Sequence, residues 1–328
     1  MTASTLSTEL APFRERFPWW GGDLQTLANR LRRSRVDLAV DRSERLSFVM
    51  ADGDILLATL DRPVVAQAGR PLAILIHGLT GWQDSDYIRS QARVLLEAGW
   101  RVLRLNLRGA GPSRPLCGGH YFAGRSQDLR ELLTLLPAAL TEAGTVAVGY
   151  SLGGAMLLKY LGEEGGASRL KAAVTVSAPI DLSVSCRSIR RPRNFLYHHF
   201  LLREMKREAT AMGAVLSAEE RRAILRSASI WHYDDAFIAP RHGFAGAEDY
   251  YKRCKPAAFM AGIRVPTLIV AALDDPWIPG ALYSDYDWRT NKALVPMLSP
   301  HGGHVGFHGA PGDPPWSDRL VARFLANV

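Results

Sequence analysis

The chain has 328 residues, of which 47% are hydrophobic and 22% are charged, and its formal net charge is +8. This composition is typical of a globular protein and excludes a disordered or low-complexity chain. No apolar run reaches the roughly 18 residues that a membrane-spanning helix needs, and residues 1–17 lack the apolar core of a secretory signal, so we expect a cytoplasmic protein. The three cysteines, Cys117, Cys186 and Cys254, indicate neither a disulfide framework nor a zinc site.

Short apolar runs alternate with longer amphipathic stretches along most of the chain. Before this alternation begins, residues 45–50 and 55–60 flank Asp52-Gly53 and predict an antiparallel hairpin. The later runs predict strands at 72–77, 101–106, 145–150, 172–177, 266–272 and 294–298, and helices at 85–98, 126–141, 152–162 and 317–327. Strands that alternate with helices indicate an α/β protein with a mostly parallel, doubly wound sheet.

The alternation stops after residue 177 and resumes at residue 266. Between them, residues 183–260 carry only helix-like patterns, which include 195–212 and 217–229. Ser217 and Glu220 predict a capping box at the start of the second of these helices. We therefore expect an α/β core formed by 1–182 and 257–328, with 183–256 inserted as a helical lid.

A candidate nucleophile lies between the strand at 145–150 and the helix that follows it. Gly149-Tyr150-Ser151-Leu152-Gly153 matches the pattern G-x-S-x-G, in which a sharp strand-to-helix turn exposes the serine Oγ. Glycines on both sides of Ser151 allow the strand and the helix to approach closely. Taken alone, the motif is also compatible with a glycine turn that carries a capping serine.

An activated serine needs an imidazole base, which follows the nucleophile and the acid in chain order in this topology. Among His301, His304 and His308, we choose His304 because it lies deepest in a glycine-rich loop and precedes apolar Val305 and Phe307. His301 is the main rival. A metal site made by the three histidines is not favoured, because no carboxylate pattern accompanies them.

The acid that orients this base should lie at the end of the preceding strand. Asp274 and Asp275 both follow the run at 266–272. Adjacent side chains on a turn point in different directions, so only one of them can reach His304, and we favour Asp275. Asp274 is then expected to be a turn-forming aspartate bonded to local backbone amides.

The oxyanion of a tetrahedral intermediate needs two preorganised donors. The backbone N–H of Leu152, at the start of a helix, is one candidate. The second should come from the loop after the first parallel strand, His77-Gly78-Leu79-Thr80-Gly81, where the N–H of Leu79 is the best candidate. His77 itself is expected to be a structural histidine.

The sequence resembles the α/β-hydrolase fold, and within it the YheT-like (AB-hydrolase-4) esterase family. The resemblance rests on motifs in the same order across nearly the whole chain: Trp19-Trp20, Gln25-Thr26-Leu27, His77–Gly81, Asn106–Gly109, Gly149–Gly154, Asp274–Pro276 and Gly302–Phe307. It implies a serine carboxylesterase with Ser151, Asp275 and His304 as its triad, acting on short- to medium-chain acyl esters without a metal or cofactor. Acyl transfer to alcohols is the alternative, and a non-catalytic ligand-binding scaffold is a third reading.

The inserted helices carry an apolar stripe and a strong positive charge. Phe195, Tyr197, Phe200 and Leu201 are expected either to wall a substrate pocket or to pack the lid on the sheet. Residues 187–226 hold ten basic and four acidic side chains, which form a solvated face or contact an anionic membrane surface. We expect a small-molecule ester as partner and no nucleic acid, because aromatic and basic residues are not interleaved.

Overall fold

The apolar runs of the sequence form one sheet. The computed structural model describes residues 11–31, 38 and 42–327; residues 1–10, which belong to the stretch searched for a secretory signal, lie outside this part. The strands are β1 (Ser43–Val49), β2 (Ile55–Asp61), β3 (Leu72–Ile76), β4 (Val102–Leu105), β5 (Thr145–Tyr150), β6 (Leu170–Val176), β7 (Thr267–Ala272) and β8 (Leu294–Ser299). Each lies within two residues of the boundaries predicted for it.

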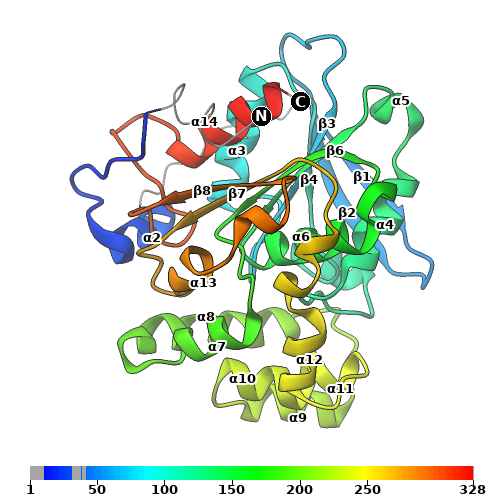
Figure 1. The fold of residues 1–328 in the computed structure, drawn as a ribbon. Helices are drawn as coiled ribbons and strands as arrows, with labels where there is room; N and C mark the ends of the chain where they lie inside the picture. The colour runs from blue at the N-terminus through cyan, green and yellow to red at the C-terminus, as the bar shows by residue number, and fades with distance from the viewer. Residues whose placement is uncertain (1–10, 32–37, 39–41, 328) are drawn as a thin grey trace.

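The strands are arranged in the order β1-β2-β4-β3-β5-β6-β7-β8 (Figure 1). β1 pairs with β2 and β2 with β4 in antiparallel register, whereas every pairing from β4 to β8 is parallel. The hairpin expected around Asp52-Gly53 is present, and Gly53 turns the chain with a φ of +87°. The predicted fold class, a mostly parallel sheet with antiparallel N-terminal strands, is confirmed.

Helices cover both faces of the sheet. Leu72, Ile74 and Ile76 of β3 pack into one core with α4 (Ser126–Leu135) and α6 (Leu152–Glu164). Ala73 and Leu75 point to the other face, where α3 (Asp86–Glu97) and α14 (Trp316–Ala326) complete a second core. A strand with apolar side chains on both faces is the pattern of a buried parallel sheet.

The helix predicted at 126–141 is interrupted. The structure has α4 up to Leu135 and a separate short helix, α5 (Ala138–Thr141). Leu136 is extended, with φ −60° and ψ 133°, because the ring of the following Pro137 disfavours the helical conformation in the residue before it. The prediction of one continuous helix was therefore wrong, although its apolar stripe is buried as expected.

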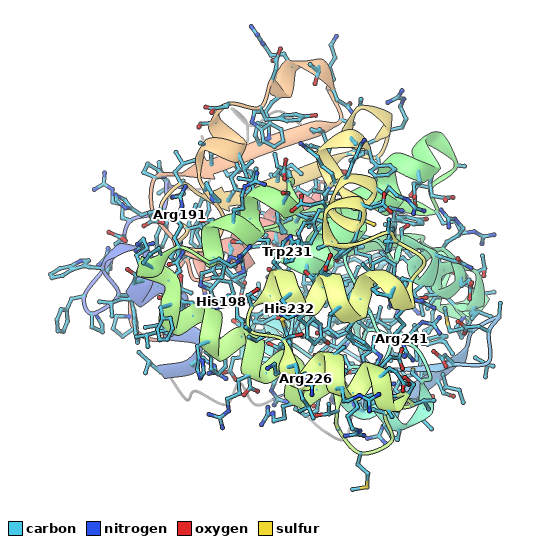
Figure 2. All side chains as sticks on the ribbon, turned by 90° about the horizontal axis from the view of Figure 1, so that it is seen from below. Arg191, His198, Arg226, Trp231, His232 and Arg241 are labelled. Carbon is cyan, nitrogen blue, oxygen red and sulfur yellow. The ribbon has the colours of Figure 1, made fainter. Side chains whose placement is uncertain are left out.

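A block of helices lies between β6 and β7, below the sheet in Figure 1. It comprises α7 (Leu182–Ile189), α8 (Phe195–Ala209), α9 (Ala218–Arg226), α10 (Ile230–Tyr233), a π-helix (Asp234–Ile238), α11 (Ala239–Arg241) and α12 (Ala247–Cys254). We call residues 182–254 the helical segment; it has an apolar core of its own. Figure 2 views it from below, with Arg226, Trp231 and Arg241 on three different helices.

The remaining elements are two helices and several turns of 3-10 helix. The helices α2 (Gly21–Leu31) and α13 (Ala281–Ser284) lie outside the alternation, and turns of 3-10 helix occur at Gly111–Leu116, Gly165–Ala167, Pro192–Asn194, Pro256–Ala258, Met260–Gly262 and Trp288–Thr290. The predicted capping box is present, since the Ser217 hydroxyl accepts from the Glu220 N–H and the Glu220 carboxylate from the Ser217 N–H. Within the described part of the chain, no helix is long and apolar enough to cross a membrane.

Candidate active site

Ser151 occupies the turn between β5 and α6 in a conformation that few residues adopt. Its φ of +48° and ψ of −119° fall outside the regions that are favourable for a residue with a Cβ atom, which costs about 1–3 kcal/mol. Gly153 makes the turn possible, because a Cβ atom there would lie 2.3 Å from the carbonyl oxygen of His77. The surrounding structure therefore holds a serine in a strained position at the carboxyl end of β5.

His304 lies beside this serine. Its Nε2 is 2.9 Å from the Oγ of Ser151, and its Nδ1 is 2.7 Å from the Oδ2 of Asp275. Because a carboxylate only accepts, Nδ1 carries the proton and Nε2 is left to accept from the serine hydroxyl. His304 and Asp275 are 5% and 7% exposed, whereas Ser151 is half-buried, so the structure brings the three chosen residues together with the serine nearest to solvent.

The carboxylate of Asp275 is held on both of its oxygens. Oδ1 accepts from the N–H of Trp277 at 2.8 Å and from the N–H of Ile278 at 3.1 Å, while Oδ2 faces His304. The ring of Trp277 also packs against the imidazole, with 4.2 Å between the ring centroids. Backbone donors of this kind fix the direction in which the carboxylate points.

Asp274 points away from this site and has a different role from the one expected. Its Oδ1 accepts from the N–H of Gly303 at 2.9 Å, an amide 29 residues further along the chain rather than a local one. The expectation of bonds to neighbouring amides was wrong, because the turn brings Asp274 against the loop that carries His304. Burial raises the pKa of Asp274 above its ordinary value.

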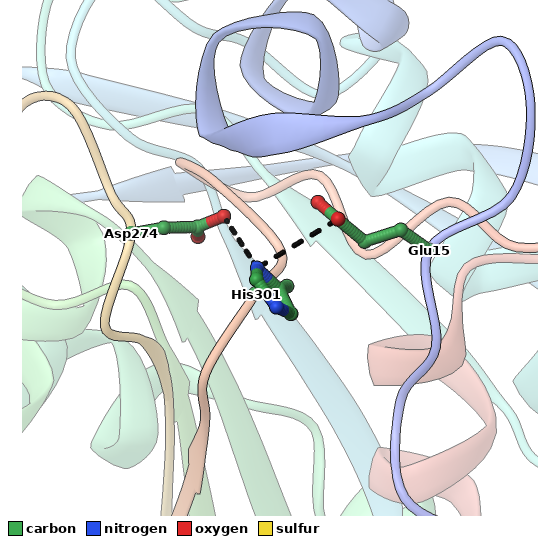
Figure 3. Close-up of side chains that lie close together, drawn as sticks. All are labelled: Glu15, Asp274 and His301. Atoms are coloured by element: carbon green, nitrogen blue, oxygen red, sulfur yellow. Dashed lines mark ion pairs between the residues drawn. The ribbon is translucent and has the colours of Figure 1, made fainter.

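His301, the rival base, lies on the far side of Asp274. Its Nδ1 is 3.4 Å from Oδ2 of Asp274 and 3.7 Å from Oε2 of Glu15, and its side chain is about half exposed (Figure 3). These three side chains offer metal-ligand atoms within 4.8 Å of one another. The grouping differs from the three histidines considered in the sequence, since His308 instead contacts Asn29 at 2.9 Å.

The N-terminal helix α2 supports the loop that carries His304. The Oγ1 of Thr26 accepts from the N–H of His304 at 2.8 Å, and the side-chain amide of Gln25 bonds both the N–H and the carbonyl of His308. On the other side of the loop, the hydroxyl of Ser177 accepts from the N–H of Val305 at 3.1 Å. Motif reasoning did not assign these supports, although Gln25 and Thr26 lie in a motif that the resemblance includes.

The loop after β3 leaves one backbone donor free beside Ser151. The N–H of Gly78 donates to the hydroxyl of Tyr87 at 2.9 Å, and the N–H of Thr80 to the hydroxyl of Tyr121 at 2.7 Å. Between them, the N–H of Leu79 has no acceptor among the residues that the structure describes, and the same holds for Leu152 at the start of α6. Both candidate oxyanion donors are therefore available for a ligand.

His77 has a structural place in this loop. Its Nδ1 lies 2.8 Å from the carbonyl oxygen of Gly78, and its Nε2 accepts from the N–H of Leu107 at 3.0 Å. Complete burial lowers the pKa of His77 to about 4, so the ring is neutral and both of its nitrogens are used. The side chain holds the loop and is not positioned to transfer a proton.

Ser151 and His304 open onto a cleft of about 660 Å³ between the core and the helical segment. Its walls are mostly aliphatic and include Pro179, Leu182, Ile189, Leu201, Ile230 and Ile278. Of the four predicted wall residues, only Leu201 lines it. The rotation of α8 about its axis decides which of its side chains reach the cleft. The apolar periodicity of the sequence did not reveal this rotation.

The remaining three predicted wall residues point elsewhere. Phe195 is 65% exposed to solvent. The hydroxyl of Tyr197 donates to Asp23 at 3.0 Å, and the ring of Phe200 packs under the guanidinium of Arg30 at 3.9 Å. The prediction that these three residues form a pocket wall was wrong, because the lining of the cleft does not include them. Tyr197 and Phe200 instead pack against the apolar core of the helical segment, and Phe195 meets solvent.

A buried acid lies in the wall of the cleft. Asp234 begins the π-helix of the helical segment and is only 9% exposed. The hydroxyl of Tyr251 donates to its Oδ2 at 2.6 Å, but burial dominates and raises the pKa of Asp234 to about 7. π-Helical turns often occur at functional sites, where they place a side chain that a regular helix would turn away.

A family model described as the alpha/beta hydrolase fold matches residues 71–311. The chain belongs to the α/β-hydrolase fold family. It is 32% identical over 298 residues to "Putative esterase YheT" of Escherichia coli (strain K12), an alignment that covers 87% of this chain and 84% of that protein. The predicted fold and its YheT-like family are thereby confirmed, and the chain is an esterase-like member of the family.

Other relatives carry related names. The chain is 29% identical to "Medium-chain fatty acid ethyl ester synthase/esterase 2" of Saccharomyces cerevisiae, with 78% of this chain and 62% of that protein covered. It is 27% identical to "Phospholipase ABHD3" of Mus musculus over 78% of this chain and 63% of that one. The Pyrococcus furiosus esterase Pf2001 shares its fold with a TM-score of 0.58, 15% identity, and 97% and 98% of the two chains covered.

The buried Asp234 generates a prediction about stability and pH. Because its pKa is about 7 in the folded chain and near 4 in an unfolded one, the unfolded state binds fewer protons between these values, and native stability falls as pH rises through them. Asp234→Asn keeps an acceptor for Tyr251 and removes this penalty. We expect the variant to be more stable at pH 8, on the order of 1–3 kcal/mol, with a much smaller gain at pH 4.5.

Urea unfolding at the two pH values measures this difference. Asp313→Asn, at an exposed position, serves as the control and is expected to change little at either pH. A stability change for Asp234→Asn that is the same at pH 4.5 and pH 8 would contradict the prediction.

Proposed function

We propose that the protein is a serine carboxylesterase that hydrolyses short- to medium-chain acyl esters through an acyl-enzyme on Ser151. The observation that carries this proposal is the unbroken contact from Asp275 through His304 to the Oγ of Ser151. An imidazole that accepts from a serine hydroxyl while a carboxylate holds its other nitrogen is the arrangement that activates serine. Two free backbone donors beside the same Oγ supply the oxyanion site.

In the proposed reaction, Nε2 of His304 takes the proton of Ser151 while Oγ attacks the ester carbonyl carbon. The N–H groups of Leu79 and Leu152 stabilise the oxyanion of the tetrahedral intermediate. The intermediate collapses, the bond to the alcohol oxygen breaks, and protonated His304 gives its proton to the leaving alkoxide. A water molecule, deprotonated by His304, then attacks the acyl-enzyme and releases the acid. No step requires a metal or a cofactor.

The walls of the cleft support an apolar acyl group as part of the substrate. Aliphatic side chains dominate the lining, and a relative that acts on medium-chain fatty acid esters is among those most similar to this chain. The helical segment supplies Ile189, Leu201 and Ile230 to these walls, which supports the view of 183–256 as a lid over an α/β core of 1–182 and 257–328. Initial rates with p-nitrophenyl esters from acetate to palmitate measure the chain length that the cleft accepts.

The first prediction from this mechanism concerns the nucleophile. Ser151→Ala is expected to lower ester hydrolysis by about 10⁴-fold or more, because it removes the hydroxyl that His304 contacts and activates. Ser185→Ala, a serine in the same cleft, should retain activity and is the matched control. The native chain should release a burst of p-nitrophenol if deacylation limits turnover, and should react with a fluorophosphonate probe.

Two results would count against the nucleophile. An active Ser151→Ala variant whose circular dichroism matches that of the native chain would refute its role. A native chain that fails to react with the fluorophosphonate probe would instead favour a non-catalytic ligand-binding scaffold.

A second prediction separates the two adjacent aspartates. Asp275→Asn is expected to reduce kcat by roughly 10³–10⁴-fold, because an amide at this position no longer holds His304 in the reactive tautomer. Asp274→Asn keeps an acceptor for the N–H of Gly303 and should lose less than about tenfold. Steady-state kinetics on one activated ester compare the two variants, and equal losses would contradict the assignment of Asp275.

Acyl transfer to an alcohol is the second candidate function. It is favoured by one observation, the similarity to a protein named as both an ethyl ester synthase and an esterase. The same acyl-enzyme serves both reactions, and the choice depends on whether water or an alcohol reaches it. With an ester and excess ethanol, we expect the free acid to be the main product; a predominance of ethyl ester in the product analysis would favour the transferase.

A further inference from the structure

Large apolar side chains are exposed where the N-terminal segment meets the start of α8. Phe17 is 71% exposed, Trp20 60%, Phe195 65% and Leu196 80%. The rings of Phe17 and Trp20 pack edge to face at 5.7 Å, so they form a projecting aromatic pair rather than two separate side chains. An exposed apolar group of this size marks a binding surface more often than a single exposed leucine does.

Contacts of α2 with α8 and the turn before it bring together the two segments that carry these side chains. Asp23 of α2 pairs with Arg193 at 3.0 Å and accepts from the hydroxyl of Tyr197 at 3.0 Å. About two turns further along α2 and one turn further along α8, the guanidinium of Arg30 lies 3.9 Å over the ring of Phe200. These contacts place the first turn of α2, which directly follows Trp20, beside the start of α8, where Phe195 and Leu196 are exposed.

The charge around this surface is positive. Arg190 and Arg191, in the turn between α7 and α8, are exposed, and neither forms an ion pair with a residue that the structure describes. Figure 2 labels Arg191 at the turn that joins α7 to α8. Arg14 and Arg16 are exposed in the N-terminal segment, while the charge of Arg193 is balanced by Asp23.

The surface also lies next to the candidate active site. The ring of Tyr197 packs on Trp277 at 5.6 Å, and Trp277 packs on His304 at 4.2 Å. The side-chain amide of Asn194 donates to the carbonyl oxygen of Pro276 at 2.6 Å, directly after Asp275. The start of α8 is thus one layer of side chains away from the groups proposed to do the chemistry.

We propose that this surface, formed by Phe17, Trp20, Arg190, Arg191, Phe195 and Leu196, docks the protein on an anionic lipid bilayer. Exposed Trp, Phe and Leu side chains enter the headgroup region of a bilayer, and neighbouring arginines attract its anionic lipids. Both features are needed, since arginines alone adsorb weakly and apolar groups alone do not select for charge. Docking would bring the cleft close to acyl esters in the membrane, a consequence that rests on the proposed esterase function.

Co-sedimentation with vesicles tests the docking surface without any reference to catalysis. We expect binding to vesicles of phosphatidylglycerol and phosphatidylcholine in equal amounts, weaker binding to pure phosphatidylcholine, and a decrease with added salt. The double variant Trp20→Ser/Leu196→Ser should bind at least about tenfold more weakly, because it removes two inserting side chains. Arg190→Glu/Arg191→Glu should also lose about tenfold, by repulsion from the anionic lipids.

The matched control is Val64→Ser/Val65→Ser, which removes two equally exposed apolar side chains, 76% and 74% exposed, between β2 and β3. It should bind as the native chain does. Failure of the native chain to bind anionic vesicles would overturn the proposal. Two other results would show non-specific adsorption and also overturn the proposal. One is a similar loss of vesicle binding in the control variant, and the other is a loss of binding only in the charge-reversal variant.

Activity measurements keep this proposal separate from the esterase proposal. Ser151→Ala should bind vesicles as the native chain does, because docking does not use the catalytic serine. The vesicle experiment therefore tests docking even if the esterase assignment is wrong. The Trp20→Ser/Leu196→Ser variant should keep its kcat/KM on a dissolved p-nitrophenyl ester and lose about tenfold on the same ester carried in anionic vesicles. Equal losses on both substrates would show damage to the fold and would not support docking.

Discussion

The close approach of helix α6 to the loop after β3 is the constraint on which the rest of the site depends. It is possible only because residue 153 has no side chain, since a Cβ atom there would collide with the carbonyl of His77. This contact fixes the strained turn at Ser151 and brings the free N–H groups of Leu79 and Leu152 to one place. The serine and its oxyanion donors thus share a single packing requirement.

The proposed catalytic residues could be predicted from the sequence, because a local motif and the order of the residues along the chain identify them. Ser151 lies on a strand-to-helix turn, and His304 lies in a loop after the last strand, so topology alone brings them to the same edge of the sheet. The walls of the cleft could not be predicted, because the rotation of α8 about its axis is set by its tertiary contacts. The same limit applies to α2, whose partners in the loop that carries His304 lie more than 270 residues away along the chain.

The helical segment has an apolar inner side that faces the cleft and a charged outer side that faces solvent. Its inner side provides aliphatic walls and the buried carboxyl of Asp234, which burial shifts toward the protonated form. Its outer side carries arginines in contact with solvent, such as Arg191 and Arg226, which are labelled in Figure 2. Composition shows only that the segment is basic and also contains apolar residues. The packed structure is needed to show which of them face the cleft and which face solvent.

The hydrogen bond from the His304 N–H to Thr26 has a consequence for the minimal catalytic unit. The range that matches the family model, 71–311, contains Ser151, Asp275 and His304 but excludes α2 altogether. A chain trimmed to that range would retain every reacting group and still leave the amide of its base without an acceptor. Boundaries drawn from sequence similarity alone would thus separate the imidazole from the segment that holds it in place.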